Sequence, residues 1–87
     1  MLIRVHRRVN RIHPEIKDED AIAALENSIR SAPREGTGFP PEWIGIGIDM
    51  NGRLLQYVAV NLNDDEWLIF HAMSATRKVL NELGVGR

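Results

Sequence analysis

The sequence contains no cysteine and few aromatic residues, namely two Trp, two Phe and one Tyr. Without thiols the chain can form no disulfide bond, cysteine-based zinc site, iron–sulfur cluster or cysteine nucleophile. Its histidines, His6, His13 and His71, are too far apart in the sequence to suggest a metal site. We therefore expect no bound metal and no cofactor, and the composition is compatible with a reducing compartment.

Long hydrophobic runs are also missing. The longest stretches without a charged residue, 54–63 and 67–76, hold ten residues each, which is about half the length of a membrane-spanning helix. Arginines near the N-terminus interrupt any apolar segment that could act as a secretory signal. We expect a cytoplasmic protein with no membrane association. With 87 residues, 44% of them hydrophobic and 26% charged, the chain 1–87 suits a single small domain.

Charge is distributed unevenly along the chain, although the net charge is only −1. Residues 1–14 carry +4, residues 15–66 are acidic, and residues 67–87 carry +2. The positive side chains of the first segment are Arg4, Arg7, Arg8 and Arg11. If the two basic ends lie side by side, they form a local field that attracts a polyanion such as RNA. The alternative is a set of solvated arginines on an exposed face.

Helical periodicity dominates the N-terminal half. Hydrophobic residues recur at steps of three and four over the first sixteen positions, which predicts an amphipathic helix. Pro14 should end this helix near Ile12, because the residue before a proline is disfavoured in helical conformation. A short strand over Leu2–Val5 is the alternative for the first residues. An acidic run at 18–20 suits a helix N-terminus, and the apolar stripe behind it predicts a second helix over 18–31.

Strand patterns dominate the C-terminal half. Residues 43–50 alternate between large apolar side chains and a nearly bare face with Gly45 and Gly47. The pair Asn-Gly that follows favours a two-residue hairpin turn into a returning strand over 54–62. A second turn leads to a strand over 66–73. Three antiparallel strands in a meander are therefore predicted.

A last helix should follow the meander, with Ser74 as its N-cap and Gly84 as its stop. The segment 34–42, which contains Gly and Pro-Pro, is expected to be an irregular connection. The predicted fold class is thus α+β: two N-terminal helices, a three-stranded antiparallel meander and a C-terminal helix. We further expect the first and last helices to be neighbours, so that their basic side chains pool.

The sequence has neither a glycine-rich phosphate loop nor a nucleophile-elbow motif. What remains is metal-free chemistry on a phosphodiester, where a cation stabilises the negative charge that develops and an acid or base moves protons. His71 ends a core strand, and Arg77 and Lys78 open the last helix. An imidazole and two cations at one strand-to-helix junction, with the arginine row, would suffice for RNA cleavage by the 2′-hydroxyl. A purely structural histidine is the alternative.

Several motifs follow one another in the stretch Ile44–Gly84. A hairpin of the form "IG-D-x-x-G-x-x-L" spans 46–55, a strand ends in Ile-Phe-His-Ala-Met at 69–73, and a basic helix start follows. This stretch resembles the second half of small toxins of the RelE-like superfamily, above all the BrnT-like group. The acidic helix start at 18–20 and the basic segment before it also resemble that family. Where the family commonly has Arg-x-Lys-Tyr, this chain has Thr-Arg-Lys-Val at 76–79.

The resemblance implies a RelE/BrnT-like fold and an endoribonuclease activity, either free or dependent on the ribosome. It implies a co-encoded antitoxin as partner, often of the ribbon-helix-helix type, and RNA as substrate, with ribosome-associated mRNA as one candidate. By position it implies catalytic roles for His71, Arg77, Lys78 and His13. The arginines expected to bind RNA are Arg4, Arg7, Arg8 and Arg11.

Two functions follow from these observations. The first is a toxin-type endoribonuclease that cleaves RNA without a metal and is neutralised by its antitoxin. The alternative is a non-catalytic module that binds protein or RNA, such as a decayed toxin that still holds its antitoxin.

Overall fold

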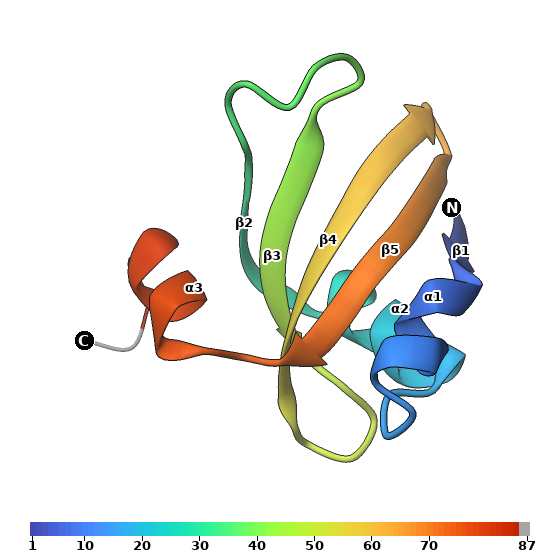
Figure 1. Cartoon of the computed structure of the whole chain (residues 1–87), viewed down its shortest axis with the longest axis vertical. Coiled ribbons are helices and arrows are strands. Elements are labelled where there is room, and N and C mark those ends of the chain that lie inside the picture. The colour runs from blue at the N-terminus through green and yellow to red at the C-terminus, as the bar shows by residue number, and fades with distance from the viewer. Residues whose placement is uncertain (86–87) are drawn as a thin grey trace.

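The computed structural model describes residues 1–85 and contains one mixed sheet with the strand order β1-β5-β4-β3-β2 (Figure 1). The strands are β1 (Leu2–Val5), β2 (Ser28–Pro33), β3 (Glu42–Ile48), β4 (Leu54–Asn63) and β5 (Glu66–Ser74). The helices are α1 (Arg7–Ile12), α2 (Asp18–Glu26) and α3 (Arg77–Glu82). β1 runs parallel to β5, and the other neighbouring strands are antiparallel.

The predicted fold class of two N-terminal helices, a three-stranded meander and a C-terminal helix is wrong, because the sheet has five strands and the chain begins with a strand. The meander itself is confirmed as β3, β4 and β5. The alternative of a short strand over Leu2–Val5 is confirmed as well. The helix predicted over 18–31 ends at Glu26, and the chain continues as β2.

β1 forms because β5 offers it a partner from the far end of the chain. Leu2 to Val5 pair in register with residues 66–69, and Ile3 and Val5 pack against buried residues on one side of the sheet. A parallel pair of this kind joins segments that are distant in sequence. The hydrophobic periodicity of the first residues cannot reveal such a partner.

α2 stops early because its last turn packs directly on β3. A Cβ atom at Gly47 would lie 1.8 Å from the carbonyl oxygen of Ala24, so only glycine permits this approach. The Oγ of Ser28 then donates to the carbonyl of Leu25 at 2.7 Å. Beyond that turn the backbone of β2 pairs with β3, with a register shift between Ser28 and Arg30.

The sheet has a hydrophobic cluster on each side. One side, which we name the α2 face, carries the cluster that contains Val9 of α1, Ala24 of α2 and Tyr57 of β4. The other side, the α3 face, carries the cluster that contains Val58 of β4 and Val79 of α3. Because α1 and α3 pack on opposite faces, they lie on opposite sides of the sheet, as Figure 1 shows. The expectation that the first and last helices are neighbours is therefore wrong.

Within residues 1–85, no helix is long and apolar enough to cross a membrane.

Candidate functional site

The structure brings two of the histidines together. The ring centroids of His13 and His71 lie 6.1 Å apart, and the ring planes meet at 82° in an edge-to-face arrangement. His13 is the C-cap of α1, and its backbone N–H donates to the carbonyl of Val9. His71 lies in β5, two residues beyond Ile69, which is the last residue of β5 to pair with β1. Because β1 ends there, α1 rather than another strand borders this part of β5.

His71 is half-buried and projects toward the α3 face. It stands opposite Val58 in the register of β4 and β5, and residues directly opposite each other in a sheet share a face. Burial lowers the pKa of His71 below its ordinary value, and the nearby charges of His13, Arg8 and Arg34 lower it further. The neutral imidazole is therefore favoured at neutral pH, which is the form that accepts a proton.

His13 has a different environment. Its Nδ1 atom lies 3.5 Å from Oε2 of Glu15, so the two side chains form an ion pair whenever the imidazole carries its second proton. His71 has no comparable carboxylate among the charges that act on it. One imidazole thus stands beside a carboxylate and the other near positively charged side chains.

Arg8 and Arg34 are the arginines whose charges reach His71. Arg8 belongs to the predicted arginine row and is exposed on α1. Arg34 follows β2 and is bound by Glu82 of α3 at 3.2 Å. No sequence pattern points to Arg34, because it falls in the segment 34–42, for which the sequence predicts an irregular connection. Only the pairing of β2 with β3 brings it to this side of the molecule.

The remaining predicted cations lie elsewhere. Arg77 and Lys78 are exposed in the first turn of α3, and they are not among the charges that act on His71. Arg4 is paired with Glu66 at 3.0 Å. Arg7 and Arg11 are exposed on α1. The N-cap of α3 is Thr76, whose Oγ1 accepts from the N–H of Val79, and the prediction of Ser74 for this role is wrong.

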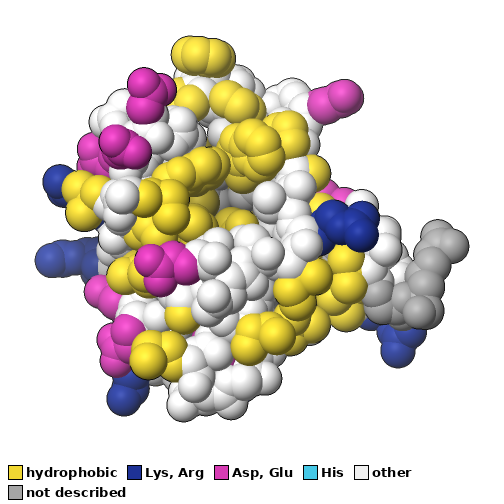
Figure 2. Space-filling model, turned by 180° about the vertical axis from the view of Figure 1, so that it is seen from behind, with side chains coloured by type: hydrophobic (Ala, Val, Ile, Leu, Met, Phe, Trp, Pro, Cys, Tyr) yellow, Lys and Arg dark blue, Asp and Glu magenta, His cyan; other side chains and the backbone are white. Residues whose placement is uncertain are grey.

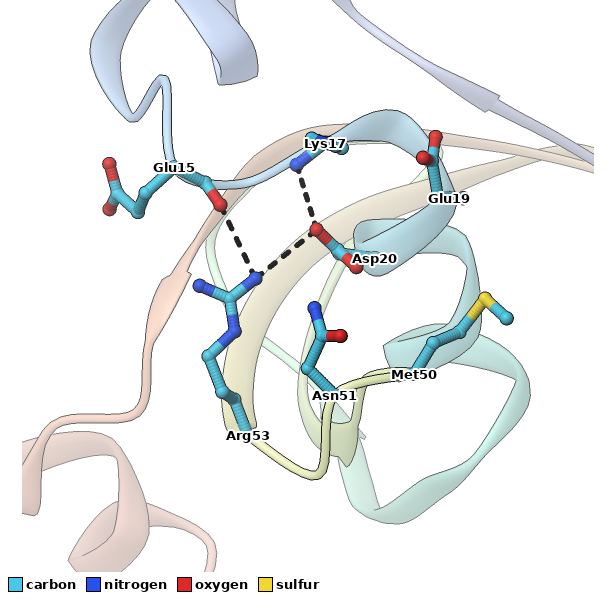
Figure 3. A pocket seen from close by; sticks show the side chains of 7 residues that line it. All are labelled: Glu15, Lys17, Glu19, Asp20, Met50, Asn51 and Arg53. Carbon is cyan, nitrogen blue, oxygen red and sulfur yellow. Dashed lines mark hydrogen bonds and ion pairs between the residues drawn. The ribbon is translucent and has the colours of Figure 1, made fainter.

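A second group of charged residues gathers where the β3–β4 hairpin meets the start of α2 (Figure 3). Arg53 donates to the carboxylates of Asp49 at 2.6 Å and Asp20 at 3.1 Å, and to the carbonyl of Glu15 at 3.3 Å. Asp49 also accepts the backbone N–H groups of Asn51 and Arg53. The predicted two-residue turn is therefore wrong: strand pairing stops at Ile48 and Leu54, and Asp49 organises the loop between them.

In this second group of charged residues, which we name the hairpin group, the carboxylates of Asp20 and Asp49 both have hydrogen-bond partners. Burial alone would raise the pKa of Asp49, but the hydrogen bonds from Arg53 and Asn51 outweigh it and lower the pKa. Every buried polar side-chain atom in the described part of the chain has a hydrogen-bond partner. Among the same residues no cluster of His, Asp or Glu could hold a metal ion. We interpret the hairpin group as a structural connection between the loop and α2.

Comparison of the chain with protein-family models, with curated proteins and with solved structures finds no match. The candidate site thus stands on the geometry of its own residues.

Proposed function

We propose that the protein is an endoribonuclease that cleaves RNA without a metal ion, with His13 and His71 as its acid and base. The observation that carries the proposal is that the imidazole rings of His13 and His71, which are far apart in the sequence, have centroids 6.1 Å apart. Two such groups with arginines nearby are what cleavage by an internal 2′-hydroxyl requires. The resemblance to RelE-like and BrnT-like toxins supports the same class of reaction, and by analogy the partner is a co-encoded antitoxin.

In this mechanism neutral His71 takes the proton from the ribose 2′-hydroxyl, and the 2′-oxygen attacks the phosphorus. Protonated His13 donates its proton to the departing 5′-oxygen. The products are a 2′,3′-cyclic phosphate and a free 5′-hydroxyl. Arg8 supplies positive charge to the phosphate as the pentacovalent state forms, and its guanidinium suits this role because its donors match phosphate oxygens. Arg34 adds to the positive potential at His71, although its ion pair with Glu82 reduces that contribution.

RNA binding along α1 would rest on its exposed arginines, Arg7, Arg8 and Arg11. For Arg77 and Lys78 on α3, a catalytic role rests on the resemblance alone, because neither is among the charges that act on His71. The cytoplasm, where RNA substrates and a co-encoded antitoxin would both be available, is the compartment in which we propose that the protein acts.

The proposal is tested with a single-stranded RNA that carries a fluorophore and a quencher, incubated with the protein in the presence of EDTA. We expect cleavage that persists in EDTA and stops when the 2′-hydroxyl at the cut site is replaced by hydrogen. His13→Ala and His71→Ala should each lower the rate by roughly 10²–10⁴-fold, the usual contribution of one acid or base. Cleavage at the original rate in both variants would overturn the assignment.

His6 provides the matched control. It is exposed, and its imidazole caps α1 by accepting the backbone N–H of Arg8 at 3.1 Å. His6→Ser removes an imidazole but keeps a capping oxygen, so this variant should cleave RNA at the parental rate. If no variant and no parental protein cleaves RNA, while a co-encoded antitoxin still binds, the non-catalytic binding module is the correct function.

Expression in a host cell gives a second readout. The parental protein should arrest growth when it is produced without an antitoxin, and the His13→Ala, His71→Ala double variant should not. Arrest of equal strength by the double variant, at equal protein level, would contradict a nuclease that depends on these imidazoles.

A further inference from the structure

The α2 face contains an apolar cavity of about 310 Å³ that the proposed cleavage does not use. Figure 2 looks at the molecule from behind and shows hydrophobic side chains gathered around a hollow. The cavity is lined by Met1, Leu25, Ser28, Ser31, Trp43, Tyr57 and Trp67. Both tryptophans of the chain are in this set. No side chain of the lining carries a charge.

Two indole rings form part of the wall. The ring centroids of Trp43 on β3 and Trp67 on β5 lie 6.1 Å apart, with their planes at 80°. Both side chains are half-buried, so each keeps surface that faces solvent or a ligand. Indole faces stack on flat heteroaromatic rings, and this is how proteins hold unpaired nucleobases.

Hydroxyl groups form another part of the wall. Tyr57 Oη lies 2.5 Å from Ser28 Oγ, and the two hydroxyls share a hydrogen bond in which either can be the donor. Burial raises the pKa of Tyr57, while the hydroxyls of Ser28 and Ser31 oppose that rise. The hydroxyl groups of Tyr57, Ser28 and Ser31 are the polar side-chain atoms that the lining offers to the polar edge of a ring.

Gly45 is what allows the phenol to reach this place. A Cβ atom at Gly45 would lie 2.3 Å from the ring of Tyr57, so the ring lies directly on the bare backbone of β3. The cavity is therefore set by the packing of the sheet and is present before any ligand arrives.

We propose that this cavity binds a single unstacked nucleobase, and that it does so through stacking and hydrogen bonds without contacting a phosphate. Its volume lies at the small end of the range for ligand pockets, roughly 300–1,000 Å³, which suits one ring system. No side chain of the lining is charged, and the α-amino group of Met1 is the one charged group that the lining residues contribute, so a nucleoside and the matching nucleotide should bind with similar affinity. The base comes from a free nucleoside or from a single strand.

The site is separate from the histidine pair. Tyr57 belongs to the cluster of the α2 face, whereas His71 stands opposite Val58, which belongs to the cluster of the α3 face. Base binding can thus be measured in the His71→Ala variant, in which we expect RNA cleavage to be at least about a hundredfold slower. Failure of the nuclease proposal would leave this one intact, and the reverse also holds.

Intrinsic tryptophan fluorescence tests the proposal directly, because both fluorophores line the cavity. The folded His71→Ala protein is titrated with adenosine, with adenosine monophosphate and with an adenine oligodeoxynucleotide, under excitation that the bases do not absorb. We expect saturable quenching with similar affinities for nucleoside and monophosphate. Saturation by adenosine would identify free nucleoside as a ligand, and saturation by the oligonucleotide alone would identify a base within a strand.

Two substitutions at one position provide matched variants. Trp43→Leu removes one stacking face and should weaken binding by roughly tenfold or more, while Trp67 still reports it. Trp43→Phe keeps an aromatic face and should retain most of the affinity. Circular dichroism establishes that both variants are folded.

Several results would overturn the proposal. One is that no nucleoside or oligonucleotide quenches the fluorescence in a saturable way. Another is that folded Trp43→Leu binds as tightly as the parent. Equal quenching by N-acetyl-phenylalaninamide is a third, since it would mean that the cavity accepts any aromatic ring, as a groove for a protein partner does.

Discussion

Gly47 of β3 lies so close to the carbonyl oxygen of Ala24 in α2 that a Cβ atom on the glycine would be 1.8 Å from that oxygen. The obstacle is backbone, which cannot rotate away as a side chain can. Ala21 and Ala24 of α2 are fully buried. The contact between Gly47 and Ala24 fixes where α2 ends and where β2 begins.

Gly47→Ala should therefore destabilise the protein by more than about 3 kcal/mol, above the range usual for overpacking. Urea denaturation monitored by circular dichroism measures the change. Gly45→Ala is the comparison, because its clash is with the side chain of Tyr57, and Tyr57→Leu in the same chain should relieve it. A loss below 1 kcal/mol in Gly47→Ala would mean that α2 is not held this closely.

The lowered pKa of His71 makes folding stability depend on pH. Between the ordinary histidine pKa of 6.5 and the lower native pKa, His71 is protonated in the unfolded chain but neutral in the folded protein. The unfolded state therefore binds more protons in this range. Stability should fall as pH is lowered from 6.5 toward the native pKa and should be insensitive to this group above 6.5. His71→Gln should remove that slope from a series of urea midpoints. A slope that is unchanged in His71→Gln would assign it to another group.

The same shift predicts the acid side of the cleavage profile. The rate should fall only as pH drops through the native pKa of His71, which lies below its ordinary value of 6.5, because His71 then becomes protonated and cannot act as base. His6→Ser should leave the profile in place. A profile whose acid limb lies above 6.5 would contradict the role given to His71.

Asp49 and Arg53 should govern stability in acid. Because the hydrogen bonds of Asp49 lower its pKa, the contribution of its charge is complete above the ordinary value of 3.8 and is lost as pH falls through the native value. Arg53→Met leaves buried carboxylates without their cation, and we expect a loss of about 3 kcal/mol or more at neutral pH. Its stability should fall less on acidification than that of the parent. Parallel pH curves for the two proteins would disprove this coupling.

Arg8 and Arg77 should differ in their effect on RNA binding. Arg8 lies among the charges that reach His71, whereas Arg77 opens α3 on the opposite side of the sheet from α1. In the His71→Ala protein, Arg8→Gln should lower the slope of log affinity against log salt by about 0.7, as expected for one lost phosphate contact on a single strand. Arg77→Gln should leave the slope unchanged. The opposite ranking would move the RNA path to α3.

The local patterns of the sequence predicted the meander, because strict alternation, turn residues and apolar runs report the pairing of adjacent strands. They also indicated the start of α2 from its acidic run and the end of α3 near Gly84, and they placed His71 in the last strand, although β5 continues to Ser74. These features depend on residues that are close together in the chain. His13 and His71 were both candidates from the sequence, but nothing in their spacing indicated that their rings meet.

Only the tertiary structure decided which segments became partners across long distances. β1 and β2 exist because β5 and β3 present open edges to them, and this pairing overrides the helical periodicity of both segments. It separates α1 from α3, moves Arg77 and Lys78 away from α1, and brings Arg34 toward His71. Backbone hydrogen bonds between strands that are distant in sequence produce no repeating residue pattern in either strand. Composition and spacing therefore indicated which residues belong to the site, but not how these residues are arranged in space.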